Sequence, residues 1–459
     1  MIELGLSRIQ QLLAHTPLPW RAIHVSGTNG KGSVCATITA LLDIYNSSAA
    51  RAHTRHPRLR HGRFTTPHLI SRRDSVAVDG LAVSDALFRT VEADVLSRGV
   101  VAATEFEVLT AVAFEVFSRS RVDVGVVEVG MGGRLDATNV LGVMPDGTQP
   151  SDDADADFRP APLATGITDI GLDHVEFLGP TLGDIAREKA GIVKRGVPVV
   201  ASAPVAEDVR HVISETARER HVSDLVYVSP ATTLGDVWRQ NGETEPLPDA
   251  TKPVQTRWAN GAVALQLTWK ALRRLGRLDG VPTPLRAELM RSLADAVDHV
   301  VWHGRLERVD LSPIVGRECV AVIDGAHNAD SANVLRRFLD STAGTEQGTT
   351  WIMAMSGQKK ISELLPILLR PGDTLYAVEF GPVEGMPWIK PAKSEDIVQE
   401  AARITTDSSS HRSCRTQLEP ALKEACESAV RQRHRVVVTG SLYLVGEMYK
   451  LLRPYAPEP

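Results

Sequence analysis

The sequence predicts an α/β protein with two domains, each built on a largely parallel β-sheet. Its 459 residues exceed the usual size of one domain. Short valine-rich runs such as Val122–Val129 alternate with helix-like segments in both halves of the chain. Polar motifs follow these runs, where open α/β sheets bind ligands. We expect a first domain at residues 1–306 and a smaller second domain at 307–459.

Composition excludes several classes of protein. The net charge is −5, so nothing indicates a global attraction to nucleic acid or to an anionic membrane. No apolar run approaches the roughly 18 residues of a membrane span, and the N-terminus lacks a signal-peptide pattern. The four cysteines are scattered without a CxxC pair, which suits a reducing compartment. We expect a cytoplasmic monomer with no nucleic-acid or membrane partner.

The first functional candidate is a glycine-rich loop after a predicted strand. Residues Ala22–Val25 form an apolar run, Gly27–Ser33 reads Gly-Thr-Asn-Gly-Lys-Gly-Ser, and helical periodicity follows. Such a strand, loop and helix can cradle phosphate, because backbone N–H groups and the helix N-terminus converge on an anion. Lys31 can reach outer phosphates, and Ser33 or Thr28 can hold a metal. A glycine separates the lysine from the serine, unlike the usual P-loop; the alternative is a plain glycine-rich turn.

Three other stretches predict loops. Residues 51–63 hold five arginines and three histidines, either a basic lip for an anionic substrate or, as we favour, a solvated insertion within 48–63. Residues 143–162 are rich in proline and aspartate and predict a flexible insertion, not a metal cluster. Residues 228–256 are polar and proline-rich and predict a variable loop.

The remaining elements are predicted from composition and caps. Thr104 and Glu107 form a capping box for a helix that continues to Phe117. Further segments are predicted as strands at 122–129, 164–170, 198–201, 320–323, 350–354, 374–378 and 435–438, and as a helix at 181–194. Residues 302–307, Trp-His-Gly-Arg-Leu-Glu, read as a hinge-region motif.

Seven motifs in order resemble the folylpolyglutamate synthase and dihydrofolate synthase family, within the Mur ligase superfamily. They cover nearly the whole chain and comprise residues 27–33, 65–68, 128–139, 173–174, 188–192, 324–328 and 439–446. The resemblance implies a P-loop-type ATPase domain followed by a Rossmann-like glutamate ligase domain. It also implies ATP and Mg²⁺ as cofactors.

The same resemblance implies ATP-dependent amide formation. A pterin-linked carboxylate attacks the γ-phosphate of ATP and becomes an acyl phosphate, and the amine of L-glutamate then displaces phosphate. A carboxylate is a poor electrophile, and phosphorylation supplies the leaving group. Phosphoryl transfer depends mainly on positioning and charge neutralisation.

The family's nucleotide and metal residues can be carried over by motif. Gly30, Lys31, Gly32 and Ser33 match the ATP phosphate loop, and Asn260, Arg305 and Asp324 match nucleotide contacts. Thr66, Glu128 and His174 match the ligands of one Mg²⁺, where Thr66 replaces the family's usual serine. A glutamate and a hydroxyl are hard-cation ligands, whereas a histidine is less usual and can equally be a hydrogen-bonding core residue.

Further residues match the substrate and catalytic positions of the family. Lys189 matches a lysine that is carbamylated; the alternative is a helix-surface lysine paired with Glu188 or Asp184. Thr104, Phe106 and Asp136 match the pterin pocket, although Phe106 could equally be core packing and Thr104 purely structural. His327 and Ser441 are candidates near the acyl phosphate or glutamate; the expected catalytic set is Lys31, Lys189, His174 and His327.

Three functions follow from these observations. The first is a dihydrofolate synthase, which joins L-glutamate to dihydropteroate. The second is a folylpolyglutamate synthase, which extends a reduced folate, and one enzyme can do both. Asn29 favours the first, because dedicated eukaryotic polyglutamate synthases tend to have lysine there. The third is a non-catalytic ATP- or folate-binding protein, against which the retained charged residues speak.

Overall fold

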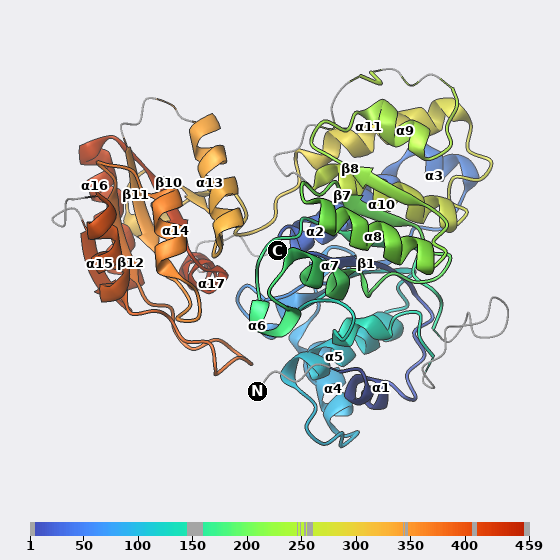
Figure 1. Ribbon diagram of the computed structural model, residues 1–459, viewed down its shortest axis with the longest axis horizontal. Helices are drawn as coiled ribbons and strands as arrows, with labels where there is room; N and C mark the ends of the chain where they lie inside the picture. The colour runs from blue at the N-terminus through green and yellow to red at the C-terminus, as the bar shows by residue number, and fades with distance from the viewer. Residues whose placement is uncertain are drawn as a thin grey trace. The chain divides into compact units, whose positions relative to one another are not determined.

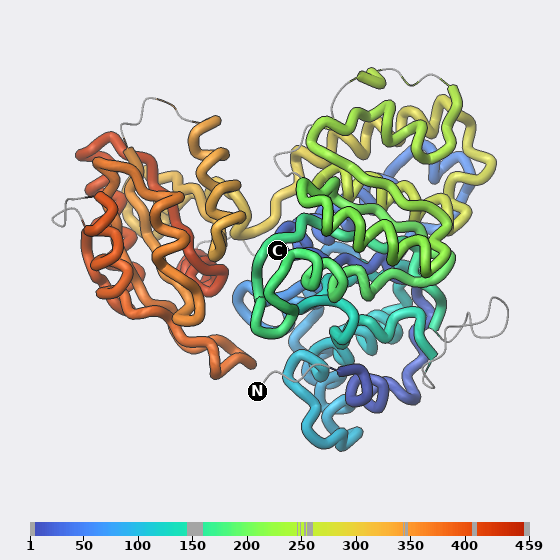
Figure 2. The backbone as a smooth tube through the Cα atoms, in the orientation of Figure 1, coloured from blue at the N-terminus to red at the C-terminus, as the bar shows by residue number. Residues whose placement is uncertain are grey.

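The chain forms two compact units. The computed structural model describes residues 5–144, 159–245, 247, 249–251, 254, 260–342, 344, 348–405 and 411–453. The first unit comprises Met1–His68 and Arg73–Val300, and the second comprises Leu69–Arg72 and Val301–Pro459. Figure 2 traces the chain from blue to red, with residues 301–453 of the second unit in yellow to red. The predicted boundary after residue 306 falls inside the second unit, and residues 69–72 were not predicted to belong to it.

The first unit is built on an eight-stranded sheet. Its strands lie in the order β4-β3-β2-β5-β1-β6-β7-β8, parallel from β2 to β8 and antiparallel at the β3 and β4 edge. The strands are β1 (Arg21–Ser26), β2 (His61–Phe64), β3 (Val76–Val78), β4 (Leu81–Ala82), β5 (Val124–Glu128), β6 (Ala164–Ile167), β7 (Val199–Ser202) and β8 (Leu225–Val228). Every residue of β5 is buried, as expected of a parallel strand covered on both faces.

Helices cover both faces of this sheet (Figure 1). The helices are α1 (Ser7–Leu12), α2 (Lys31–Ser47), α3 (Ala49–Thr54), α4 (Asp85–Leu96), α5 (Glu105–Arg119), α6 (Val175–Leu178), α7 (Leu182–Ala190), α8 (Glu207–Glu219), α9 (Leu234–Gln240), α10 (Gly261–Arg274) and α11 (Thr283–Val297), with 3₁₀ turns η1 (Arg72–Ser75) and η2 (Ala137–Val140). Alternation along β1 divides the core: Ile23 and Val25 join the cluster of α2, α10 and α11, whereas Ala22 joins that of α1, α4 and α5.

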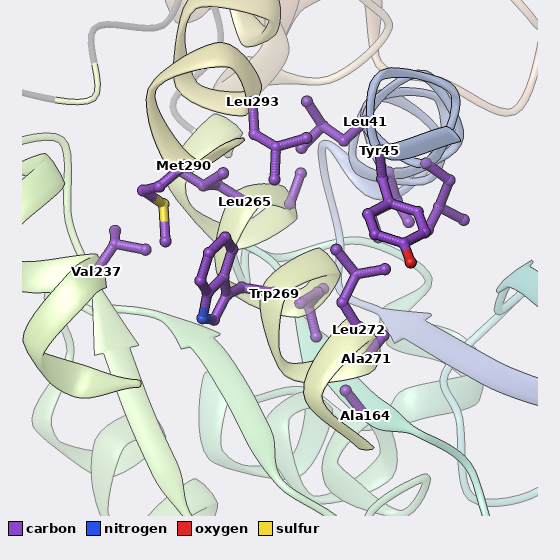
Figure 3. Close-up of a cluster of buried hydrophobic side chains, with 14 of the residues drawn as sticks. Leu41, Tyr45, Ala164, Val237, Leu265, Trp269, Ala271, Leu272, Met290 and Leu293 are labelled. Atoms are coloured by element: carbon purple, nitrogen blue, oxygen red, sulfur yellow. The ribbon is translucent and has the colours of Figure 1, made fainter. Parts of the chain in front are cut away.

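The cluster beneath α2 and α10 fixes the helix that follows the glycine-rich loop. Figure 3 shows Leu41 and Tyr45 of α2 close to Leu272 of α10, with Leu293 of α11 alongside. All four side chains are fully buried. This packing anchors α2 along its length, so its N-terminus stays in register with the end of β1.

Two loop predictions were wrong. Residues 51–63 are not one solvated loop, because α3 covers 49–54 and β2 begins at His61 inside the sheet. Residues 228–256 contain α9, whose Val237 and Trp238 are buried, so apolar spacing outweighed the polar composition there. Most of the predicted insertion at 143–162 lies outside the described residues.

The second unit is built on a six-stranded sheet in the order β13-β12-β11-β14-β10-β9. Among the strands that the structure describes in this sheet, only β9 is antiparallel to its neighbour. The strands are β9 (Glu307–Asp310), β10 (Val320–Ile323), β11 (Gly348–Met353), β12 (Thr374–Val378), β13 (His411–Arg415) and β14 (His434–Thr439). The helices are α12 (Ser312–Val315), α13 (Ala329–Ser341), α14 (Ile361–Leu368), α15 (Ser394–Thr405), α16 (Leu418–Gln432) and α17 (Leu442–Leu452).

The core of the second unit brings the ends of two strands together. Side chains of α12, α16 and α17 share one cluster with β10, β11, β12 and β14. Strands β10 and β14 are adjacent and parallel, so Asp324 and Ser441 follow neighbouring strands at the same edge of this sheet. The predicted fold class, two α/β domains with mainly parallel sheets, is confirmed. Among the described helices, none is both long and apolar enough to cross a membrane.

Candidate functional site

The glycine-rich loop joins β1 to α2 with the geometry of an anion cradle. Gly30 is the N-cap of α2, has a left-handed backbone (φ +87°) and provides no side-chain cap for the helix. The first turn of α2 therefore presents its N–H groups without a competing side-chain acceptor from the cap residue. Lys31 Nζ lies 3.2 Å from the carbonyl oxygen of Thr28 and so folds back over the loop.

Two glycines of this loop are required by close contacts. A Cβ on Gly30 would lie 1.8 Å from Asn260 Nδ2, and a Cβ on Gly27 would lie 1.8 Å from Thr168 Oγ1. Asn260, a predicted nucleotide contact, is thus packed directly against the loop. Its Oδ1 accepts a hydrogen bond from Ser202 Oγ at 3.1 Å.

Lys189 lies beneath the same loop. Its side chain is buried, and Nζ donates to the carbonyl oxygen of Gly27 at 2.7 Å. The alternative of a surface lysine paired with Glu188 or Asp184 is wrong: Glu188 pairs instead with Arg134, at 2.9 Å. Burial, and after it the positive charge of Lys31, lower the pKa of Lys189 to about 7, against the opposing charges of two aspartates.

Two of the three expected metal ligands are joined by a hydrogen bond. Glu128 ends β5 and is buried, and its Oε2 accepts from the backbone N–H of Thr66 at 3.0 Å. His174 is exposed and has a left-handed backbone (φ +53°), and its backbone N–H donates to Asp173 Oδ1 at 2.9 Å. In the described part of the chain, no three His, Cys, Asp or Glu side chains group as a metal site.

The expected pterin residues gather around the start of α5 and the loop after β5. Thr104 caps α5, and the predicted capping box with Glu107 is confirmed. Phe106 is half-buried and stacks on Phe64, with ring centroids 6.2 Å apart. A Cβ on Gly130 would lie 2.4 Å from the Phe106 ring, so this glycine makes room for it.

Asp136, which the sequence places in the pterin pocket, also bonds the backbone of its own loop. It is buried and accepts hydrogen bonds from the N–H groups of Met131 and Thr138 and from Thr138 Oγ1. Burial raises the pKa of Asp136, while these hydrogen bonds oppose the rise. His24 Nε2 lies 2.9 Å from Thr138 Oγ1, so a histidine from β1 also supports this loop.

In the second unit, Arg305 and Asp324 are neighbours across one turn. Asp324 is buried, and its Oδ2 accepts from the backbone N–H of Leu306 at 2.8 Å. Burial raises the pKa of Asp324 to about 6, against the opposing positive charge of Arg305. A Cβ on Gly325 would lie 2.5 Å from Arg305 Nη1, so the guanidinium packs on the backbone beside Asp324.

His327 and Ser441 lie at the starts of two helices of this unit. His327 Nδ1 is 2.9 Å from the carbonyl oxygen of Gly325, which fixes the ring close to the 324–328 segment. Ser441 is buried and caps α17 by accepting from the N–H of Tyr443 at 3.1 Å. The sequence did not predict Ser202 of the first unit, whose hydroxyl donates to Asn260. The signal that could have indicated it is its position at the end of strand β7.

Comparison with known proteins gives matches over the whole chain. The family model described as dihydrofolate synthetase, C-terminal domain, matches residues 307–451. A probable dihydrofolate synthetase from Schizosaccharomyces pombe is 33% identical, covering 98% of this chain and 99% of that protein. The dihydrofolate synthetase from Saccharomyces cerevisiae is 32% identical, covering 98% of each. A bifunctional folylpolyglutamate synthase/dihydrofolate synthase from Yersinia pestis, solved with AMPPNP and an Mn ion, has a TM-score of 0.70 at 25% identity, covering 98% of this chain and 94% of that chain.

Proposed function

Because the chain belongs to the dihydrofolate synthetase and folylpolyglutamate synthase family of ligases, we propose that it joins L-glutamate to dihydropteroate at the expense of ATP. The observation that carries this choice is identity of 32–33% over the full length of two dihydrofolate synthetases. The second candidate is a bifunctional enzyme that also extends reduced folates, favoured by the fold shared with the Yersinia pestis enzyme.

The residues present fit a nucleoside triphosphate and a divalent cation. Gly30 leaves the first turn of α2 without a side-chain cap, and Lys31 supplies a positive charge beside it. Glu128 and Thr66 offer oxygen ligands, which Mg²⁺ prefers. We propose that ATP is bound by Gly30, Lys31, Gly32, Ser33 and Asn260. Mg²⁺ would be held by Thr66, Glu128 and His174. The nucleotide would also be contacted by Arg305 and Asp324. Bound Mg²⁺ would withdraw charge from the phosphate oxygens.

The proposed reaction has two steps. A carboxylate oxygen of dihydropteroate attacks the γ-phosphorus of ATP, the bond to the bridging oxygen breaks, and ADP leaves. The amine nitrogen of L-glutamate then attacks the acyl carbon of the acyl phosphate, inorganic phosphate leaves with the electron pair of the broken C–O bond, and the nitrogen loses a proton to give the amide. Lys31 neutralises charge on the outer phosphates, and the α2 N–H groups hold them in line. We assign Lys189, carbamylated, to support of the metal and His327 and Ser441 to the acyl phosphate or glutamate.

The proposed binding site of the acceptor lies at the start of α5 and the loop after β5. We propose that Thr104 and Phe106 contact the pterin, since the aromatic ring of Phe106 is half-buried and retains an exposed part. Asp136 contributes from its buried network and keeps the loop after β5 in place. The Phe64 ring, stacked on Phe106, limits the rotation of that side chain.

The test is release of phosphate from ATP with Mg²⁺ and L-glutamate, comparing dihydropteroate with tetrahydrofolate as acceptor. Turnover with dihydropteroate alone is the expected result for a dihydrofolate synthetase. Turnover with both acceptors would identify the bifunctional enzyme, and turnover with tetrahydrofolate alone would overturn the proposal.

The metal assignment is tested with the variant Glu128→Gln. It keeps the size of the side chain and an oxygen for the Thr66 N–H, and it removes the negative charge offered to Mg²⁺. We expect turnover to fall by about 100-fold or more, since a lost metal contact is worth several kcal/mol. The far-ultraviolet circular dichroism should not change. Turnover like that of the wild type would contradict the metal assignment.

A further inference from the structure

A cluster of three polar side chains in the second unit lies outside the proposed chemistry. Tyr449 Oη donates to Glu307 Oε2 at 2.6 Å, and His303 Nδ1 lies 3.0 Å from Glu307 Oε1. The same histidine nitrogen lies 3.1 Å from Tyr449 Oη, and the two rings meet edge to face at 5.1 Å. The side chain of Glu307 is 11% exposed, so this carboxylate is a largely desolvated centre.

The cluster holds one backbone turn. Glu307 Oε2 accepts from the N–H of Gly304 at 2.9 Å, inside the turn 302–306, which we call the Arg305 turn. On its other side, Leu306 N–H donates to Asp324 Oδ2 at 2.8 Å. Two carboxylates therefore fix the N–H groups on either side of Arg305.

The Arg305 turn needs such support because of its backbone. Gly304 and Leu306 both have positive φ, +73° and +44°. The left-handed region is unfavourable for a residue with a branched side chain such as leucine. Without its hydrogen bonds, the turn would relax and the direction of the Arg305 side chain would change. The carbonyl oxygen of Gly304 also accepts from Gly325 N–H at 2.9 Å, which ties the turn to the segment after β10.

We propose that Glu307, held by Tyr449 and His303, is a positioning residue that sets Arg305 for the nucleotide. The inference rests on the proposed function, because it takes the nucleotide as the ligand of Arg305. Glu307 acts through the turn and does not itself touch the ligand. Its oxygens are occupied by Gly304 N–H, Tyr449 Oη and His303 Nδ1.

The first test is Tyr449→Phe, which removes one hydroxyl and keeps the ring. A hydrogen bond to a charged group is lost, and we expect the Kd for ADP, measured by titration calorimetry on the full chain, to rise about three- to tenfold. The KM for L-glutamate should change less than about twofold. Glu307→Ala should raise the same Kd by more than Tyr449→Phe does.

The matched control is Tyr376→Phe in the same unit. Tyr376 is buried in β12, where burial raises the pKa of its hydroxyl and the neighbouring Ser428 side chain acts to lower it, so this variant also removes one hydroxyl that has a polar neighbour. It does not touch the Arg305 turn and should leave the Kd for ADP unchanged. If Tyr449→Phe lowers the melting temperature as Tyr376→Phe does and leaves the Kd unchanged, the cluster is structural only and the inference is overturned.

A double variant identifies the residue through which the cluster acts. Arg305→Met should weaken ADP binding by itself. In that background Tyr449→Phe should have no further effect on the Kd, because the guanidinium that it positions is gone. Additive effects would overturn the inference and leave the proposed function intact. A wild-type chain that binds no nucleotide would overturn both.

Discussion

At the scale of single residues, burial decides which ionisable groups can change state near neutral pH. Lys189 and Lys194 are both buried, and burial lowers the pKa of each to about 7. Lys189 donates to the Gly27 carbonyl of the glycine-rich loop, whereas Lys194 donates to Asn139 Oδ1 at 2.8 Å. The two lysines are therefore alike in burial and in lowered pKa, and they differ in neighbouring charges and in the backbone or side chain that each one bonds.

Lys189 gives a prediction of pH and bicarbonate dependence. Addition of carbon dioxide requires the neutral amine, whose fraction increases as pH rises through about 7. We expect ligase turnover in bicarbonate buffer to increase between pH 6 and 8, an interval centred on the pKa of Lys189. We also expect turnover to fall when carbon dioxide is removed. Lys189→Met should abolish the dependence on bicarbonate and most of the turnover.

Lys194→Met is the matched control for that experiment. It removes a lysine that is also buried and whose pKa is also lowered to about 7, but one whose partner is Asn139 rather than the glycine-rich loop. Its turnover should keep the bicarbonate dependence of the wild type. Equal dependence in Lys189→Met and wild type would rule out a carbamylated Lys189.

At the scale of elements, the start of α5 is stabilised from outside its own helix. Glu107 caps the backbone of Thr104 and also receives the guanidinium of Arg8 from α1, with Nε 2.9 and 3.1 Å from the two carboxylate oxygens. The side chains are 15% and 5% exposed. This ion pair couples the first helix of the chain to the residues that we assign to the pterin.

Arg8→Met tests that coupling. Removing one partner of a buried ion pair leaves a charge without full compensation, so we expect a loss of about 3 kcal/mol in the free energy of unfolding, measured in urea. Arg8→Met with Glu107→Gln should recover part of this loss, because the carboxylate charge is gone. Arg89→Met breaks an exposed pair with Asp85 and should cost less than about 1 kcal/mol. Equal losses in Arg8→Met and Arg89→Met would contradict the buried role.

At the scale of the whole molecule, the chain enters the second unit twice. Residues 69–72 belong to that unit although the first unit continues until residue 300. The contact is close: a Cβ on Gly446 of α17 would lie 2.0 Å from the carbonyl oxygen of Leu69. The two units have separate core clusters, so each can be destabilised by itself.

Gly446→Ala should therefore act on one unit. The added methyl meets a backbone atom that cannot move aside, and overpacking of this kind costs about 1–3 kcal/mol. We expect hydrogen exchange to accelerate in β10, β11 and β14 and to stay unchanged in β1 and β5. Gly381→Ala, where the nearest atom would be a glutamate oxygen at 3.7 Å, is the control and should change neither. Faster exchange in both units would contradict their independence.

The sequence by itself determined the fold class, the family and the glycine-rich loop before α2. These depend on local signals: valine-rich runs, the helix periodicity of α2, the Thr104–Glu107 capping box and ordered motifs, all of which lie within short segments. The resemblance to the family is confirmed by full-length relatives. The roles of the individual site residues stay predictions.

Only the tertiary structure decided which side chains are buried and which distant residues meet. The helical periodicity around Lys189 did not show whether this side chain is exposed or buried. Its burial depends on the loop at Gly27, which lies 162 positions away in the sequence. The Arg305 turn likewise depends on Tyr449, which α17 brings back to Glu307 across 142 positions. Burial, pKa and hydrogen bonding of such residues are set by packing between elements, which no local sequence pattern contains.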